Sequence, residues 1–225
     1  SHGDYKRIVL APASVQEMAS LTTKAFDLAD KYSILTMILA DGTMGQMMEP
    51  VELETAEPVK YEKPWATTGT KMQRKHNIVN SLYLKPEELE KKNFERFAKY
   101  KTIEENEVMY EEYLMDDAEI CVVSFGITAR VAKNAIVEAR AKGIKVGMIR
   151  PITLWPFPTE VLNKAADKCK AFISVEMNMG QMIEDVKLAI ECKKPVELCC
   201  RVGGMIPSPE EVLAKIEEVN KGGER

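Results

Sequence analysis

From residue 118 onward the chain alternates short apolar runs with segments of helical character, and this alternation constrains the fold more than any other feature. Four apolar runs suit buried strands, and they cover residues 118–124, 144–149, 171–175 and 196–199. Helices are predicted after them, over residues 128–142, 159–167, 180–191 and from Ser208 onward. Strands that alternate with helices in this way form an open parallel sheet covered on both faces. The sequence therefore predicts an α/β domain over residues 116–225.

Residues 1–50 contain one β-α-β unit. Apolar runs at 7–11 and 34–40 suit strands, and Ser14 with Glu17 forms a capping box at the start of the helix between them. A right-handed crossover places the two strands in one parallel sheet. Two strands do not make a stable sheet alone, and no further strand pattern follows before residue 118. We therefore expect residues 1–50 to be the C-terminal part of a larger domain. The opening Ser-His-Gly in place of Met agrees with a fragment or a tag remnant.

Residues 51–115 are predicted to be a linker followed by a charged helix. Residues 51–82 show neither helical nor strand periodicity, which favours a long crossing connection. A helix is predicted from Pro86 to about Tyr113, with proline in its first turn and one apolar stripe on an otherwise charged surface.

The segment Arg150–Pro158 holds three prolines after its arginine and two aromatic residues, Trp155 and Phe157. Proline fixes φ and lacks a backbone donor, so this segment is expected to be neither a helix nor a central strand. A stiff loop at the end of a buried strand is a common place for a binding surface. The alternative is a connector whose aromatic side chains cap the sheet.

Composition limits the partners and the location. A formal net charge of −4 makes nucleic acid an unfavourable partner, and no apolar run or leader pattern indicates a membrane span or secretion. The five cysteines contain no C-x-x-C pair, so neither a zinc site nor an iron–sulfur cluster is expected on this chain, and the thiols are expected to be reduced. These features predict a cytoplasmic protein with no metal site of its own.

Three further places are candidates for function. The loop with Asp41, Gly42, Gly45 and Gln46 follows a strand, where it can be an interface or a glycine-assisted turn. The helix start at residues 124–130 carries a weak signal for an anion site, and the favoured interpretation is that Thr128 is only an N-cap.

Glu176 ends a predicted strand, and the preceding strand ends at Arg150. We expect these two side chains to form a structural ion pair rather than an acid–base site, because the sequence offers no positioned partner for catalysis.

Several segments resemble the alpha subunits of 2-oxoacid:ferredoxin oxidoreductases, which are thiamine-diphosphate enzymes. They are Arg150-Pro-Ile-Thr-Leu-Trp-Pro-Phe-Pro158, Ile8-Val-Leu-Ala-Pro-Ala-Ser-Val-Gln-Glu17, Asp41-Gly-Thr-Met-Gly-Gln-Met-Met-Glu-Pro50 and Glu176-Met-Asn-Met-Gly-Gln-Met182. The resemblance covers nearly the whole chain. It implies that residues 1–50 are the end of a truncated pyrimidine-binding domain and that residues 116–225 are a transketolase C-terminal-like domain with an open parallel sheet.

The resemblance also implies a division of labour among subunits. Thiamine diphosphate and Mg²⁺ would be bound mainly outside this chain, by a beta subunit, and iron–sulfur clusters on other subunits would pass electrons to ferredoxin. The substrates would be a 2-oxoacid and coenzyme A. No catalytic residue is carried over to this sequence, so the chain alone is expected to be inactive. Contacts with the first domain and neighbouring subunits are expected for Asp41, Gly42, Gly45, Gln46, Arg150, Trp155, Phe157 and Glu176.

The linker motifs Lys63-Pro-Trp-Ala-Thr-Thr-Gly69 and Asn80-Ser-Leu-Tyr-Leu84 are most similar to the enzymes that act on 3-methyl-2-oxobutanoate. Homologues specific for 2-oxoglutarate or pyruvate stay open as alternatives. So do a transketolase, an NAD-linked 2-oxoacid dehydrogenase subunit and a non-catalytic α/β module that recruits or regulates a partner.

Overall fold

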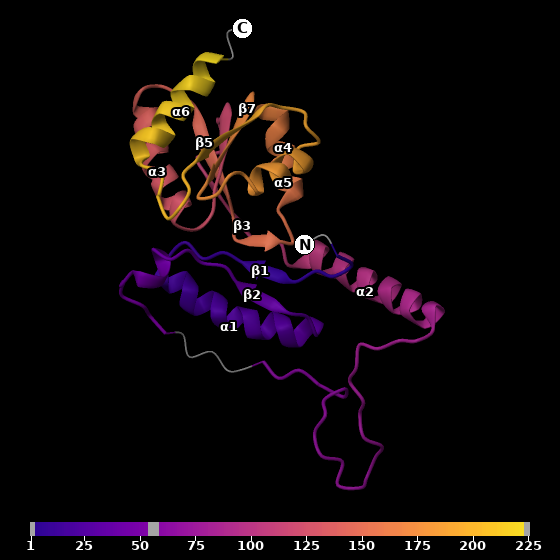
Figure 1. Ribbon diagram of the computed structural model, residues 1–225. Helices are drawn as coiled ribbons and strands as arrows, with labels where there is room; N and C mark the ends of the chain where they lie inside the picture. The colour runs from indigo at the N-terminus through magenta and orange to yellow at the C-terminus, as the bar shows by residue number, and fades with distance from the viewer. Residues whose placement is uncertain (1–2, 54–58, 223–225) are drawn as a thin grey trace.

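The computed structural model describes residues 3–53 and 59–222, so the Ser-His opening of the chain lies outside it. The described residues form two sheets, and the smaller one lies below the larger one in Figure 1. Between residues 59 and 85 the backbone forms turns and extended stretches without a helix or strand, as the sequence predicts for this connection.

The larger sheet has five strands in the order β3-β5-β4-β7-β8. Four of them run parallel, namely β4 (Ile120–Val123), β5 (Val146–Pro151), β7 (Ala171–Glu176) and β8 (Val196–Cys200). β3 (Tyr110–Tyr113) pairs with β5 in the antiparallel direction at one edge. The predicted open α/β sheet is confirmed, with one antiparallel edge strand that the sequence analysis missed.

Helices cover both faces of this sheet (Figure 1). α3 (Gly126–Ala141) and α6 (Pro209–Gly222) lie on one face, and α4 (Thr159–Lys168) and α5 (Met182–Ala189) lie on the other. Each pair buries its apolar stripe in a separate core: Ile136 and Ile216 pack on one side, and Leu162 and Phe172 on the other. β4, β5 and β7 are thus buried on both sides, which explains why they read as apolar runs, whereas β8 is an edge strand in which Glu197 is exposed.

Short-range contacts mark the end of α3 and the start of α6. Gly143 follows α3 with a φ of +82°, a conformation that costs glycine little. Before α6, the backbone N–H of Glu211 donates to Ser208 Oγ at 3.3 Å, and the backbone N–H of Ser208 donates to Glu211 Oε2 at 2.8 Å.

The smaller sheet has the order β2-β1-β6. β1 (Ile8–Leu10), α1 (Val15–Tyr32) and β2 (Thr36–Ile38) form the predicted parallel β-α-β unit. The third strand, β6 (Thr153–Trp155), comes from the proline-rich segment and pairs with β1 in the antiparallel direction. The expectation of a plain loop there was wrong, although β6 is an edge strand, the position that nearby prolines allow. β2 is half-buried rather than fully buried because it forms the other edge.

α2 (Pro86–Asn106) packs its C-terminal end on the smaller sheet through Tyr100 and Ile103. The prediction of a helix as far as Tyr113 was wrong. At Glu107 the backbone leaves the helix, and the Glu107 carboxylate accepts hydrogen bonds from Lys31 Nζ at 2.7 Å and Tyr32 Oη at 2.6 Å. These bonds fix the end of α2 to the end of α1, and the chain continues into β3.

Across the described ranges 3–53 and 59–222, the structure contains no helix that is both long and apolar enough to cross a membrane.

Candidate functional site at the junction of the two sheets

A buried arginine joins the two sheets. Arg150 lies near the end of β5, and its side chain is only 5% exposed. Its Nη1 and Nη2 atoms donate to Glu17 Oε2 at 2.9 Å and Glu17 Oε1 at 2.7 Å, and its Nε donates to Glu111 Oε2 at 2.7 Å. Glu17 belongs to α1 and Glu111 to β3, so one guanidinium holds three elements. We call these three residues the Arg150 clamp.

The clamp continues the capping box of α1. The backbone N–H of Glu17 donates to Ser14 Oγ at 3.1 Å, and Glu17 Oε2 also accepts from the backbone N–H of Ala13 at 2.8 Å. The same carboxylate therefore caps the helix and receives both terminal nitrogens of Arg150, a bidentate arrangement that is stronger and more directional than a single contact.

Glu111 stays ionised in this setting. Burial alone would raise its pKa, but hydrogen bonds from Lys133 and Arg150 outweigh burial and hold the pKa of Glu111 below its usual value. The pKa of Arg150 lies above its usual value, because burial is outweighed by the bonds to Glu17 and Glu111. Glu111 thus faces two cations, Arg150 of the clamp and Lys133 of α3.

A second set of polar contacts crosses the junction beside the clamp. Arg130 Nη1 in α3 donates to Glu49 Oε1 at 2.7 Å, and Glu49 Oε2 accepts from the backbone N–H of Val15 at 3.0 Å. These two bonds, the backbone one first, lower the pKa of Glu49. The loop after β2 is thereby tied both to the start of α1 and to the larger domain.

Asp41 occupies the N-terminus of α3. Its Oδ2 accepts from the backbone N–H of Ile127 at 3.2 Å, and its Oδ1 accepts from the backbone N–H of Met44 at 2.9 Å. The helix start that the sequence marks as a possible anion site thus receives a carboxylate of the same chain, which accepts from one of its free amides. The interpretation of Thr128 as the N-cap was wrong: the N-cap is Phe125, and Thr128 Oγ1 donates to the Phe125 carbonyl at 2.8 Å.

The predicted Arg150–Glu176 ion pair is not formed. Glu176 is 2% exposed and accepts the backbone N–H groups of Gln181, Met182 and Ile183 at 2.8–2.9 Å, together with the Ser174 hydroxyl. The carboxylate therefore caps the N-terminus of α5, where free amides and the helix dipole favour a negative charge. Arg150 pairs instead with Glu17 of α1 and Glu111 of β3.

The Asp41 loop lines a small cavity at the carboxyl edge of β7. η1 (Met44–Gln46) forms a single turn there, with Met44 buried and with Gly45 and Gln46 exposed. The cavity has a volume of about 510 Å³, and its walls are Gly42, Thr43, Gln46, Met47, Met177, Gly204 and Ile206. The structure therefore brings the predicted loop close to the segment after Glu176, whereas contacts with other subunits remain a prediction.

Trp155 and Phe157 face different cores. Trp155 packs edge-on against Tyr100, with ring centroids 5.6 Å apart, in the core of the smaller sheet. Phe157 packs against the α4 side of the larger sheet. The two aromatic residues thus link the layers of this chain, and both also line a wide groove described below.

The junction holds the two sheets together, and its polar groups are engaged with one another. Glu17, Glu49, Asp41 and Glu176 accept hydrogen bonds from helix amides or arginines. In the part of the chain that the structure describes, no group of three or more His, Cys, Asp or Glu side chains is arranged to hold a metal ion. These residues do not fit a site for thiamine diphosphate or its Mg²⁺, so no catalytic step is assigned to them.

Sequence reasoning singled out Arg150 and Asp41 and placed Glu49 in the Asp41 loop, but it missed Glu111 and the second role of Glu17. The capping box already explains why a glutamate stands at position 17, so its contact with Arg150 could not be expected from the sequence. No sequence pattern marks Glu111 as a site residue, because its Tyr-Glu-Glu-Tyr segment falls within the helix that the sequence predicts up to Tyr113.

Comparison with known families gives two matches. Residues 2–114 match the family described as "Pyruvate flavodoxin/ferredoxin oxidoreductase, thiamine diP-bdg", and residues 118–212 match "Pyruvate:ferredoxin oxidoreductase core domain II".

Individual relatives are similar over almost the whole chain. The ketoisovalerate oxidoreductase subunit VorB of Methanothermobacter marburgensis is 51% identical over 97% of this chain and 62% of that protein. The 2-oxoglutarate synthase subunit KorA of the same organism is 31% identical over 96% of this chain and 64% of that protein. The chain thus spans less than two thirds of the length of these relatives.

Among solved structures, the fold is similar to that of a 2-oxoglutarate:ferredoxin oxidoreductase from Magnetococcus marinus with 2-oxoglutarate, coenzyme A and succinyl-CoA bound. The TM-score is 0.74 at 21% identity, over 97% of this chain and 43% of that one.

Proposed function

This chain belongs to the pyruvate flavodoxin/ferredoxin oxidoreductase family, and on that premise we propose that it is part of the alpha-type subunit of an enzyme that oxidises 3-methyl-2-oxobutanoate. In the assembled enzyme the acid loses carbon dioxide, its acyl group passes to coenzyme A, and two electrons pass to ferredoxin. The chain contributes to assembly rather than to the chemical step.

The choice of substrate rests on how similar the sequence is to relatives that are named for different 2-oxoacids. The chain is 51% identical to a subunit named for ketoisovalerate, which is 3-methyl-2-oxobutanoate, and 31% identical to one named for 2-oxoglutarate from the same organism. A gap of this size over the same length of chain favours the branched acid. The linker motifs at residues 63–69 and 80–84 favour it as well.

The junction supports the assembly role. Its carboxylates and arginines connect α1, the Asp41 loop, β3, β5 and α3, so they fix the smaller sheet against the larger one. Thiamine diphosphate and Mg²⁺ are then held mainly by a beta subunit and by other parts of the enzyme, and iron–sulfur clusters lie on further subunits. The complex works in the cytoplasm. The chain by itself binds the cofactor negligibly and is inactive.

The proposal is tested with the complete subunit assembled with its beta and cluster-bearing partners. We expect 3-methyl-2-oxobutanoate to reduce a viologen dye only when both thiamine diphosphate and coenzyme A are present, with 2-methylpropanoyl-CoA as the acyl product. Calorimetric titration of residues 1–225 with thiamine diphosphate and Mg²⁺ is the companion experiment, and we expect no binding at micromolar concentrations.

Two results would change the proposal. A properly assembled complex without cofactor-dependent reduction of the dye would favour a non-catalytic module. Micromolar binding of the cofactor to residues 1–225 would mean that this chain carries part of the cofactor site.

A further inference from the structure

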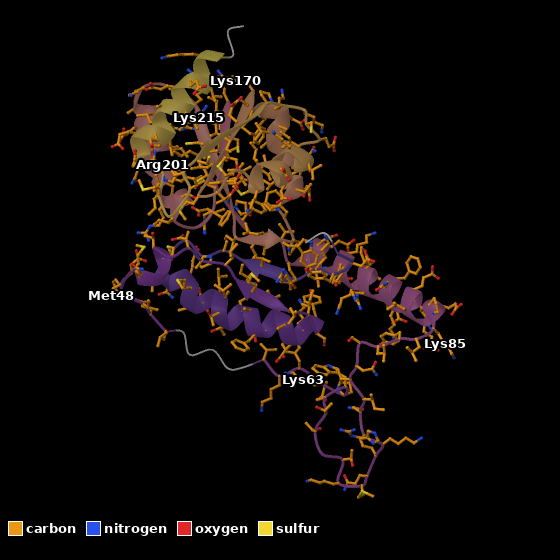
Figure 2. All side chains as sticks on the ribbon, viewed as in Figure 1. Met48, Lys63, Lys85, Lys170, Arg201 and Lys215 are labelled. Carbon is orange, nitrogen blue, oxygen red and sulfur yellow. The ribbon has the colours of Figure 1, made fainter. Side chains whose placement is uncertain are left out.

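Residues 59–85 form an arm that extends away from both sheets. Figure 2 labels Lys63 and Lys85 near the two ends of this arm, and Figure 1 shows its loop hanging below α1 and α2. Lys63 Nζ contacts Asp30 of α1 at 2.7 Å, which fixes the first end. Hydrogen bonds inside the arm are local: Asn77 Nδ2 donates to the carbonyl groups of Pro64 at 2.6 Å and Ala66 at 2.8 Å.

The arm is both basic and apolar. It contains six lysine or arginine residues and one glutamate, on a chain whose net charge is −4. Seven large apolar side chains are exposed along it, and they are Val59, Trp65, Met72, Ile78, Val79, Leu82 and Leu84. Met72 is 96% exposed and Leu84 is 85% exposed. Scattered apolar side chains on a surface are ordinary, but a series of seven on one projecting segment marks an interaction surface.

A wide groove on the larger domain has the opposite charge. It has a volume of about 1260 Å³ and lies between the end of α2, β3 and α4. Val108, Met115, Trp155, Phe157 and Val161 supply apolar surface, and the charged residues around it are five glutamates and two lysines. The glutamates are Glu104, Glu105, Glu112, Glu160 and Glu191. This volume exceeds that of a usual small-molecule pocket, about 300–1,000 Å³, and suits a peptide segment.

We propose that the basic, apolar arm of one copy of this chain docks in the acidic, apolar groove of a second copy. The arm and the groove are complementary in charge and in apolar character, which steers association and selects the partner surface. If each copy gives its arm and receives the other arm, the contact closes as a symmetric dimer.

The second end and the tip of the arm lie away from the groove of the same chain. The arm ends at Lys85, next to the first residue of α2, whereas Glu104 and Glu105 lie near the last residue of the same helix. α2 has 21 residues, which corresponds to about 32 Å of helix. In Figure 1 the arm extends away from the groove end of α2, so its tip is directed away from the groove of its own chain.

The test reverses charges on each side of the contact in the complete protein. Lys71→Glu, Arg74→Glu and Lys75→Glu together make the arm acidic, with four glutamates against three cations, and Glu104→Lys with Glu112→Lys makes the groove basic. Sedimentation at low salt should show a dimer for the unchanged protein. For either variant alone, the dimer dissociation constant should rise at least about tenfold. An equimolar mixture of the two variants should dimerise again, because each altered surface then meets its complement.

Glu90→Lys with Glu138→Lys is the matched control. Both residues are exposed on helices outside the groove, and the charge change is the same as in the groove variant. The control should dimerise normally. Recovery of the dimer in the mixture also shows that both variants are folded. If the variants dimerise as the control does, or if the mixture does not recover, the proposal is overturned. Loss of binding to another subunit while the dimer is retained would assign the arm to that subunit instead.

Discussion

Replacing Arg150 by methionine is the sharpest test of how the two sheets are held. Methionine is unbranched and fills much of the space of the arginine side chain, so the change removes the charge and the donors with little loss of volume. Glu17 loses both bonds from the guanidinium, and Glu111 keeps only Lys133. The carboxyl groups of Glu17 and Glu111 are then left at the junction with one cation fewer.

The expected loss in the free energy of unfolding follows from how deeply the Arg150 clamp is buried. Removing one partner of a buried ion pair costs about 3–5 kcal/mol, because it leaves the other charge uncompensated. The Arg150 side chain is 5% exposed, but those of Glu17 and Glu111 are 32% and 31% exposed, so water reaches the carboxylates. We therefore expect a loss of about 2–4 kcal/mol in the free energy of unfolding.

The effect should depend on pH in a defined direction. Because the pKa of Glu111 is lowered in the folded protein, its contribution to stability is present above the pKa of the unfolded chain. That contribution is lost as the pH falls through the folded-state pKa. The difference in stability between the unchanged protein and Arg150→Met should therefore be constant near neutrality and shrink below about pH 4.

Urea unfolding followed by circular dichroism at several pH values measures both effects. Arg201→Met is the control, because Arg201 forms an ion pair with Glu211 in which both side chains are more than 40% exposed. Such a pair contributes about 0–1 kcal/mol. If Arg150→Met costs no more than Arg201→Met at pH 7, the clamp does not hold the junction and the reasoning is refuted.

Three further substitutions have defined outcomes. Trp155→Ala should lower the unfolding free energy by about 2–3 kcal/mol, since the half-buried indole leaves a cavity beside Tyr100; a loss below about 1 kcal/mol in urea unfolding would contradict this. Glu176→Gln should speed amide hydrogen exchange at the start of α5 and cost about 2 kcal/mol, because one carboxylate oxygen is replaced by a donor; unchanged exchange would be inconsistent with the cap. Gly147→Ala should cost about 1–3 kcal/mol in thermal unfolding, because a Cβ there overlaps the backbone carbonyl of Leu114; an unchanged melting temperature would refute that steric argument.

The central part of the fold could be predicted because its signals are local. β4, β5 and β7 are buried on both faces and therefore read as apolar runs, and Ser14, Gly143 and Ser208 mark helix ends through short-range bonds. In such segments the preference of each residue and the demand of the tertiary structure agree.

The two missed strands depend on distant partners. β3 is Tyr-Glu-Glu-Tyr, which reads as the continuation of a charged helix, and it becomes a strand by pairing with β5. β6 lies between prolines and becomes a strand because Val9 and Leu10 of β1 pair with it from about 145 residues earlier in the chain. Pairing over such a distance leaves no periodicity for sequence reasoning to detect.

The contacts at the junction could be predicted only in part, for the same reason. Arg150 and Glu176 were expected to pair because both end neighbouring segments of the same domain, yet β5 and β7 are separated by β4 in the sheet. Glu176 is satisfied by the helix that follows it in sequence, and Arg150 is satisfied by α1 and β3. Strand order decided these partners, and strand order cannot be read from one sequence.

The most direct test of the proposed function is a competition among substrates in the assembled enzyme. Equal concentrations of 3-methyl-2-oxobutanoate, 2-oxoglutarate and pyruvate would be supplied with coenzyme A and thiamine diphosphate, and the acyl-CoA products would be quantified by mass spectrometry. We predict that 2-methylpropanoyl-CoA exceeds succinyl-CoA and acetyl-CoA by at least about tenfold, a typical discrimination for side chains that differ in size and charge. A predominance of succinyl-CoA or acetyl-CoA would contradict the assignment to the branched acid.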